Sequence, residues 1–183
     1  MQLILASSSP RRRQLLADAG FQFSVCSPEV DESLLPNEKP VDAVVRLARE
    51  KAAAVAALHP DAVVLAADTA VVLDGAFLGK PADVVEAAGM LRALSGREHD
   101  VITGFALASR EGVRSDCCRT RVAFRDLDDA EIEAYIATGE PMDKAGAYGI
   151  QSGAAHMVNT IHGSYTNVVG LPMAEVFMFL RQI

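Results

Sequence analysis

The fold is decided first by residues 2–20, QLILASSSPRRRQLLADAG. The apolar run at residues 2–6 is short and uninterrupted, which is typical of a buried strand. Pro10 suits the first position of a helix, Leu16 lies on the apolar face of that helix, and Gly20 ends it. A strand that runs through a short turn into a helix is the building unit of α/β proteins.

The remainder of the chain continues this alternation of strands and helices. Helices are predicted over residues 42–58, 83–94, 128–137 and 172–181, and strands over residues 21–26, 62–67, 70–73, 100–109, 112–124 and 154–161. Asp42 is expected to cap the first of these helices, and residues 27–40 read as a loop. Asp74 and Gly75 are typical of a tight turn. Only two residues separate the two longest strands, which predicts a hairpin and therefore an α/β fold with a mixed sheet.

Composition narrows the class of protein. A length of 183 residues suits one domain or two closely packed lobes. With 17 basic and 24 acidic residues the net charge is −7, which disfavours nucleic acid and anionic membranes as partners. The three cysteines show no CxxC spacing, and no apolar run reaches the length of a membrane span or a signal peptide. We therefore expect a soluble protein of the reducing cytoplasm.

The segment from Ser7 to Arg13 has the strongest chemical character. It joins a strand to a helix, where free backbone N–H groups and the helix dipole attract an anion. The hydroxyls of Ser7 and Ser9 add donors, and the guanidinium groups of Arg11 and Arg12 match phosphate oxygens. The alternative is a serine helix cap followed by three solvated arginines. The local residues leave both interpretations open.

Asp68 follows the apolar run at residues 62–67, at the strand end where open α/β sheets place their ligands. Asp31 and Glu32, in the loop after the second strand, could supply further oxygens to a divalent cation. Mg²⁺ takes one or two carboxylates and completes its shell with water and phosphate. The alternative is that Asp68 is a turn residue at the end of a strand.

Two lysines and one glutamine are weaker candidates. Lys80 lies in a Gly-Lys-Pro turn that lacks the spacing and the Ser or Thr of a phosphate-binding loop, and Lys51 lies on a helix beside Glu50. Each could equally be a solvated side chain. Gln151 ends the glycine-rich segment 140–151, and its amide can match the adjacent N–H and C=O of uracil or thymine. The alternative for that segment is a flexible loop.

Seven motifs occur in a defined order along the chain. They are ASSSPRR (residues 6–12), VDE (30–32), REKA (49–52), ADT (67–69), GKP (79–81), DKAGAYGIQ (143–151) and GSYTNVVGLP (163–172). Each motif alone is weak, but the ordered set resembles the Maf family of nucleotide pyrophosphatases over essentially the whole chain.

This resemblance implies a single Maf-like domain over residues 1–183. Its fold would be that of the inosine-triphosphate pyrophosphatases, with a mixed, elongated sheet flanked by helices and two lobes around a cleft. The implied reaction is hydrolysis of a nucleoside triphosphate to the monophosphate and pyrophosphate. The DKAGAYGIQ segment resembles the subfamily that prefers dTTP and UTP. A homodimer is left open.

The resemblance also assigns roles to residues. Asp68 is implied to be the general base, and Glu32 with Asp68 is implied to bind a divalent metal cation, Mg²⁺ or Mn²⁺. The substrate-binding residues are implied to be Ser7, Ser9, Arg11, Arg12, Lys51, Thr69, Lys80 and Gln151, of which Arg12, Thr69 and Gln151 match positions linked to substrate choice. Two positions depart from the family pattern, since Ser152 replaces a common glycine and Ala70 replaces a larger aliphatic residue.

Two other functions remain open from the sequence. One is a purine pyrophosphatase acting on inosine or modified guanine triphosphates. The other is a nucleotide-binding regulator of septation with little turnover. Assaying a panel of triphosphates for pyrophosphate release would distinguish all three.

Overall fold

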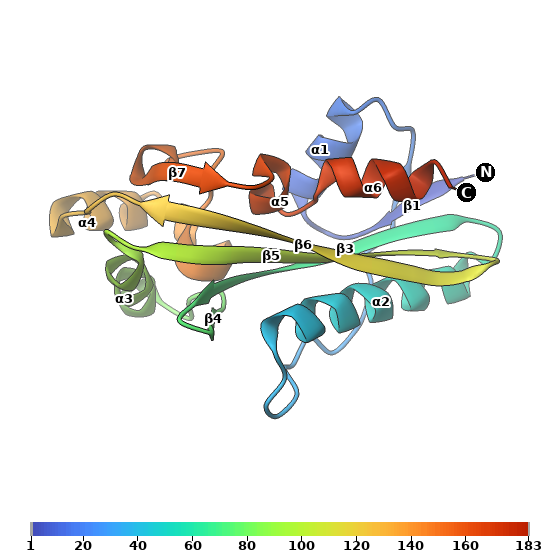
Figure 1. The fold of residues 1–183 in the computed structure, drawn as a ribbon, viewed down its shortest axis with the longest axis horizontal. Helices are drawn as coiled ribbons and strands as arrows, with labels where there is room; N and C mark the ends of the chain where they lie inside the picture. The colour runs from blue at the N-terminus through green and yellow to red at the C-terminus, as the bar shows by residue number, and fades with distance from the viewer. Residues whose placement is uncertain (1, 183) are drawn as a thin grey trace. The chain divides into compact units, whose positions relative to one another are not determined.

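The computed structural model describes residues 2–182, which form a mixed α/β fold around a seven-stranded sheet (Figure 1). The strands are β1 (Leu3–Ala6), β2 (Ser24–Val25), β3 (Val63–Leu73), β4 (Ala76–Leu78), β5 (Glu98–Ser109), β6 (Gly112–Phe124) and β7 (Val158–His162). Their order is β2-β1-β3-β5-β6-β7, and β4 pairs with β3. Strand β1 runs parallel to β2 and β3, whereas β3–β4 and β6–β7 are antiparallel. The predicted mixed sheet is confirmed.

Helices and short 3₁₀ turns connect the strands. The helices are α1 (Pro10–Asp18), α2 (Pro40–Leu58), α3 (Val84–Leu94), α4 (Asp129–Ala137), α5 (Tyr165–Val169) and α6 (Met173–Leu180), and the 3₁₀ turns are Glu140–Asp143, Ala145–Ala147 and Ala155–Met157. Sequence chemistry explains several helix starts. Asp83 caps α3, and Asp128 with Glu131 forms a capping box on α4. Within residues 2–182 no helix is long and apolar enough to cross a membrane.

Several predicted boundaries are wrong. Helix α2 begins at Pro40 with Lys39 at its N-cap, so Asp42 lies in the first turn and does not cap it. Proline suits that first position because the missing N–H would have no helical partner. The strand predicted at residues 21–26 shortens to two exposed residues, and the partly buried Phe21 and Phe23 pack against the core beside α1 instead of pairing in the sheet.

Two further elements differ from the prediction. The strands predicted at residues 62–67 and 70–73 are one continuous strand, β3. Strand β7 starts only at Val158, since the residues before it form a 3₁₀ turn, and α5 was not predicted at all. Five residues are too few to show helical periodicity in a sequence.

The described chain divides into two compact units. The first unit contains the chain up to Thr69, Thr103–Cys118 and the chain from Gly170, and the second contains Ala70–Ile102 and Arg119–Val169. The prediction of one domain over residues 1–183, and that of a cleft between lobes, therefore stay predictions. Residues 1 and 183 lie outside the described part.

In the first unit the sheet is covered on both faces (Figure 1). Alternate residues of β1 and β3 face opposite sides, as the pleat requires. Leu5 and Leu65 pack with Leu16 of α1 and Val176 of α6, while buried alanines of the same strands pack against α2. Helix α2 lies so close to β5 that a Cβ on Gly104 would come within 2.4 Å of the Val44 carbonyl.

In the second unit helices α3 and α4 pack against the sheet. Leu91 and Ile132 are buried among the side chains of β5 and β6. The buried His99 of β5 places its ring edge-on against Phe124 and Tyr148. Burial lowers the pKa of His99 to about 4, so this histidine is neutral near pH 7.

Candidate active site

The Ser-Arg segment forms the predicted junction between β1 and α1. Ser9 is the N-cap of α1, and its Oγ accepts a hydrogen bond from the Arg12 amide at 3.4 Å. Ser7, which is buried, accepts a hydrogen bond from the Ser9 amide at 3.2 Å. The helix-cap interpretation is thus correct for Ser9. Each hydroxyl still has its own proton to donate, so capping does not prevent either serine from binding an anion.

The half-buried guanidinium of Arg12 makes three hydrogen bonds. Its Nε donates to the Gly170 carbonyl at 2.7 Å, Nη2 donates to Thr69 Oγ1 at 3.0 Å, and Nη1 donates to Ser7 Oγ at 3.3 Å. Burial lowers the pKa of Arg12, and the Asp68 carboxylate opposes this shift. Arginine remains protonated in proteins nonetheless. Arg12 is therefore an ordered cation and not one of three solvated arginines.

Two residues that the sequence analysis did not select hold this cation in place. Gly170 has a φ of +123°, which a residue with a side chain rarely adopts, and its carbonyl accepts the Arg12 Nε bond. Thr103 is fully buried in β5, and its Oγ1 lies 2.9 Å from Thr69 Oγ1. Gly170 belongs to the motif GSYTNVVGLP. The sequence contained only one indication of Thr103, a single hydroxyl group within an apolar strand.

Lys51 is the centre of a second charged group. Although it lies on α2, it is only 5% exposed, so it is not part of a solvated helix face. Its Nζ lies 2.7 Å from Asp68 Oδ1 and 2.9 Å from Glu32 Oε1. The three predicted residues therefore meet around one ammonium group. A buried lysine needs such partners, because desolvation of an unpaired charge costs several kcal/mol.

Asp68 does not end a strand, as the sequence suggested, but lies within β3. The placement still has a structural reason. The pairing of β3 with β1 ends at Ala66, and its pairing with β4 begins at Val71. Asp68 and Thr69 lie between these two paired segments, just past the carboxyl end of β1. Asp68 therefore still lies at a strand end where a ligand is expected, but the strand that ends there is β1 and not β3.

Glu32 and Asp68 offer a donor set that suits a hard cation. Both place an oxygen within 2.9 Å of Lys51 Nζ, so the two carboxylates already face one positive charge. The Glu32 side chain is 59% exposed and that of Asp68 is 16% exposed. Among residues 2–182 no three or more histidine, cysteine or acidic side chains gather as a metal site. Two carboxylates fit Mg²⁺ when substrate phosphates complete its shell.

Arg11 lies in the first turn of α1, whereas the two other predicted residues belong to the second unit. Lys80 is exposed and follows β4, and Gln151 is exposed in a turn after the 3₁₀ helix Ala145–Ala147. The amide of Gly146 donates to the Gly79 carbonyl at 3.0 Å, so the turn that contains Lys80 is tied to the segment that contains Gln151. The structure thus connects the backbone segments of these two residues within that unit.

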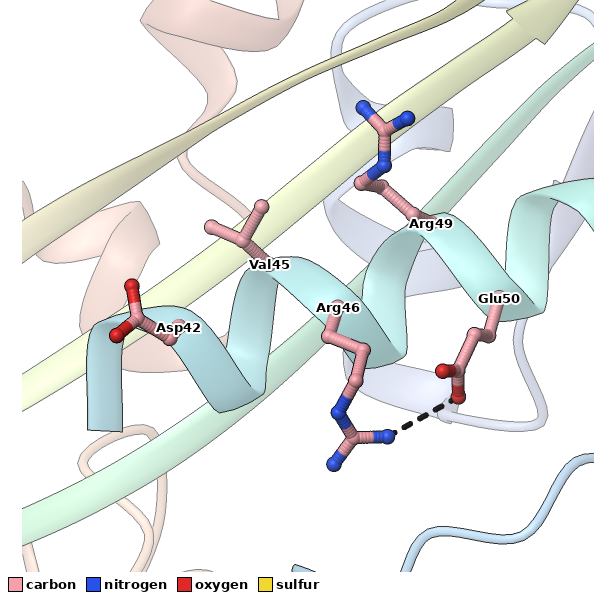
Figure 2. A pocket seen from close by; sticks show the side chains of 5 residues that line it. All are labelled: Asp42, Val45, Arg46, Arg49 and Glu50. Carbon is pink, nitrogen blue, oxygen red and sulfur yellow. Dashed lines mark hydrogen bonds and ion pairs between the residues drawn. The ribbon is translucent and has the colours of Figure 1, made fainter. Parts of the chain in front are cut away.

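A separate hollow of about 410 Å³ lies along α2. It is lined by Asp42, Val45, Arg46, Arg49 and Glu50. Figure 2 shows that these side chains all come from one helix. Arg46 Nη1 and Glu50 Oε2 form an ion pair at 3.1 Å. None of the predicted site residues lines it, and its charges are largely neutralised by one another. We therefore locate the candidate site at the start of α1 and not at this hollow.

The chain is similar to known proteins over nearly its whole length. The model of the Maf-like protein family matches residues 2–183. The chain belongs to the Maf family. It is 55% identical to a dTTP/UTP pyrophosphatase of Geobacter sp. (strain M21), covering 99% of this chain and 95% of that protein. It is 53% identical to a dTTP/UTP pyrophosphatase of Geobacter sulfurreducens, covering 100% of this chain and 96% of that protein.

A solved structure supports the fold of this Maf protein. The structure of a HAM1 protein from Coxiella burnetii aligns with a TM-score of 0.53 at 15% sequence identity and covers 100% of both chains. At that identity the likeness concerns the fold alone. The predicted family and the predicted α/β class are both confirmed.

Proposed function

We propose that this Maf protein hydrolyses nucleoside triphosphates, with a preference for dTTP and UTP, to the monophosphate and pyrophosphate. The observation that supports this most directly is the meeting of Lys51, Asp68 and Glu32 in the unit that also holds Arg12. Such a group combines cations for a polyphosphate with a carboxylate able to accept a proton. The relatives named dTTP/UTP pyrophosphatase support the substrate class.

The phosphate chain would be held by the start of α1 and by the cations that the family resemblance assigns to it. Free N–H groups at a helix N-terminus bind phosphate, and Ser7 and Ser9 can donate their hydroxyl protons to it. Arg11 and Arg12 would add fork-shaped contacts, which suit phosphate oxygens. The remaining cations assigned to the phosphates are Lys51 and Lys80. We expect these contacts to be shared by all triphosphates, since each has the same phosphate chain.

The proposed reaction is an in-line attack of water on the α-phosphorus. A bond forms between the water oxygen and the α-phosphorus, and the bond from that phosphorus to the bridging oxygen of the β-phosphate breaks. Asp68 accepts the proton of the water, and pyrophosphate leaves. General-base catalysis contributes about 10²- to 10⁴-fold. The cations must therefore supply much of the acceleration by stabilising charge on the phosphate oxygens.

Glu32 and Asp68 would hold the divalent cation, which we propose to be Mg²⁺ or Mn²⁺. Such an ion neutralises phosphate charge and lowers the pKa of bound water. Lys51 supports the same two carboxylates, because its ammonium group contacts both and reduces the repulsion between them.

Base selection would depend on Gln151, assisted by Thr69 and Arg12. An amide that matches the N–H and C=O edge of uracil or thymine discriminates because a mismatched base leaves polar groups unpaired once the bound nucleotide excludes water from them. Thr69 and Arg12 are hydrogen-bonded to each other, so a change in either alters the position of both.

The protein would act in the cytoplasm on a nucleoside triphosphate, as a single Maf-like domain. Among residues 2–182 the three cysteines form no disulfide, as a reducing compartment favours. The net charge of −7 disfavours nucleic acid as a partner.

The test is pyrophosphate release from a panel of dTTP, UTP, CTP, dCTP, GTP and ITP by the purified protein. We expect the highest kcat/KM for dTTP and UTP. A maximum at ITP would make the protein a purine pyrophosphatase. Binding without turnover of any member would favour a nucleotide-binding regulator and would refute the proposed activity.

A further inference from the structure

The turn that contains Gln151 has no regular secondary structure of its own. Gln151 is exposed and lies between the 3₁₀ turns Ala145–Ala147 and Ala155–Met157. An exposed turn of this kind samples many conformations unless side chains from other segments hold it. A glutamine that reads a base must instead keep its amide in one orientation, because a hydrogen bond weakens steeply with misalignment.

The residues before Gln151 are held by two tyrosines. The buried hydroxyl of Tyr148 lies 2.7 Å from Nε2 of His99, and the amide of Gly149 donates to the hydroxyl of Tyr135 at 3.2 Å. Both partners come from regular elements, since His99 belongs to β5 and Tyr135 to α4. One side of the turn is therefore anchored to rigid structure.

The residues after Gln151 are held by one carboxylate, that of Glu140. Its Oε2 accepts a hydrogen bond from Ser152 Oγ at 2.7 Å and another from the Gly153 amide at 3.1 Å. A Cβ on Gly153 would lie 3.2 Å from the same oxygen and 3.1 Å from the Tyr135 ring, so the close approach relies on a glycine. The two bonds fix the backbone directly behind Gln151.

Glu140 is itself held in place. Lys144 Nζ donates to the Glu140 carbonyl at 2.6 Å and pairs with Asp143 Oδ1 at 2.7 Å. The hydrogen bond from Ser152 is the main reason that the pKa of Glu140 is lowered, so the carboxylate is ionised near pH 7. An ionised acceptor forms stronger hydrogen bonds than a neutral one.

We propose that Glu140 is a positioning residue that fixes the turn of Gln151 and so sets which nucleobase the enzyme accepts. This inference rests on the proposed function, because it acts through the base contact assigned to Gln151. Ser152 has a particular part in it. It occupies a position where the resemblance leads us to expect glycine, and a glycine could not donate the side-chain bond to Glu140.

The experiment compares Glu140→Ala and Ser152→Gly with wild type, using kcat/KM for dTTP and for dCTP. Glu140→Ala removes the charged acceptor of the bonds from Ser152 and Gly153, so we expect the dTTP-to-dCTP ratio to fall by about tenfold or more. Ser152→Gly loses one bond, and we expect a fall of about threefold. The matched control is Glu133→Ala, which removes an exposed carboxylate of α4 and should leave the ratio unchanged.

Two further readouts separate positioning from a general structural effect. In a Gln151→Ala background, Glu140→Ala should change the ratio no further, because the residue through which it acts is already missing. In the protein without nucleotide, amide hydrogen exchange over residues 149–153 should be faster in Glu140→Ala than in Glu133→Ala.

An unchanged base ratio in an active Glu140→Ala enzyme would overturn the inference and leave the proposed function intact. An equal loss of ratio with and without Gln151 would also overturn it, since Glu140 would then act elsewhere. Failure of the wild type to hydrolyse any triphosphate is a different result. It would remove the proposed function and this inference together.

Discussion

Replacing Asp68 by asparagine is the most direct test of the proposed chemistry. The change removes the ability of this side chain to accept a proton, whereas the amide oxygen that remains can still contact Lys51 or a cation. Loss of a general base lowers kcat by about 10²- to 10⁴-fold. At about 1.4 kcal/mol for each tenfold change, the barrier should rise by about 3 to 6 kcal/mol.

The fold should tolerate this change, for a reason visible in the structure. An asparagine Oδ1 can still accept the hydrogen bond from Lys51 Nζ, and Glu32 remains as the charged partner of that lysine at 2.9 Å. The free energy of unfolding then falls only by the difference between a charged and a neutral hydrogen-bond acceptor, about 1 to 2 kcal/mol. For a chain of this length we expect a fall in Tm of about 2 to 8 °C.

The assay is pyrophosphate release from dTTP under saturating conditions, with a thermal melt of each variant. Asp61→Asn is the matched control, because Asp61 is an exposed carboxylate paired with Arg110 at the surface. Such pairs contribute little, so activity and Tm should both stay near wild type. If Asp68→Asn keeps kcat within a few-fold of wild type while remaining folded, Asp68 is not the general base.

The remaining predictions concern metal, base selection, pH and packing. Excess EDTA should abolish activity and Mg²⁺ or Mn²⁺ should restore it, because Glu32 and Asp68 are hard oxygen donors. Full activity in EDTA would show that the lysine and arginine side chains suffice without a metal ion. Gln151→Ala should lower kcat/KM for dTTP and UTP relative to CTP and GTP by about 10- to 100-fold, whereas Lys80→Ala should weaken all four alike; an equal loss for all four in Gln151→Ala would contradict base reading. Burial holds the pKa of His99 at about 4, below the 6.5 of an exposed histidine, so the unfolded chain binds the extra proton between these values. The free energy of unfolding should therefore fall by up to about 3 kcal/mol as the pH drops from 6.5 to 4. Urea titrations should show a smaller fall in His99→Gln, whereas the exposed His156→Gln should show the same fall as wild type. Gly104→Ala should destabilise the protein by about 3 kcal/mol or more, because its Cβ would overlap the α2 backbone. Gly89→Ala in α3 meets no atom within 4 Å and should stabilise by about 0.5 to 1 kcal/mol in the same denaturant titration; equal effects would refute the close packing at Gly104.

The sequence by itself determined the local elements whose signals are local. Pro10 and Gly20 mark the limits of α1, and the pair Asp128 and Glu131 marks the start of α4, because caps satisfy backbone groups within a few residues of themselves. The turn at Asp74 also followed from its neighbours, since a two-residue hairpin needs residues that accept positive φ. The order of the seven motifs identified the family in the same way, without knowledge of the fold.

Only the tertiary structure decided which side chains meet. Apolar residues precede and follow Asp68 alike, so the sequence suggested a strand end, whereas the strand continues and its neighbour β1 ends instead. The burial of Lys51, the support of Thr69 by Thr103 and the hold of Glu140 on the Gln151 turn all join residues distant in sequence. Periodicity reports which face of an element is apolar, but it contains no information about which distant element packs there.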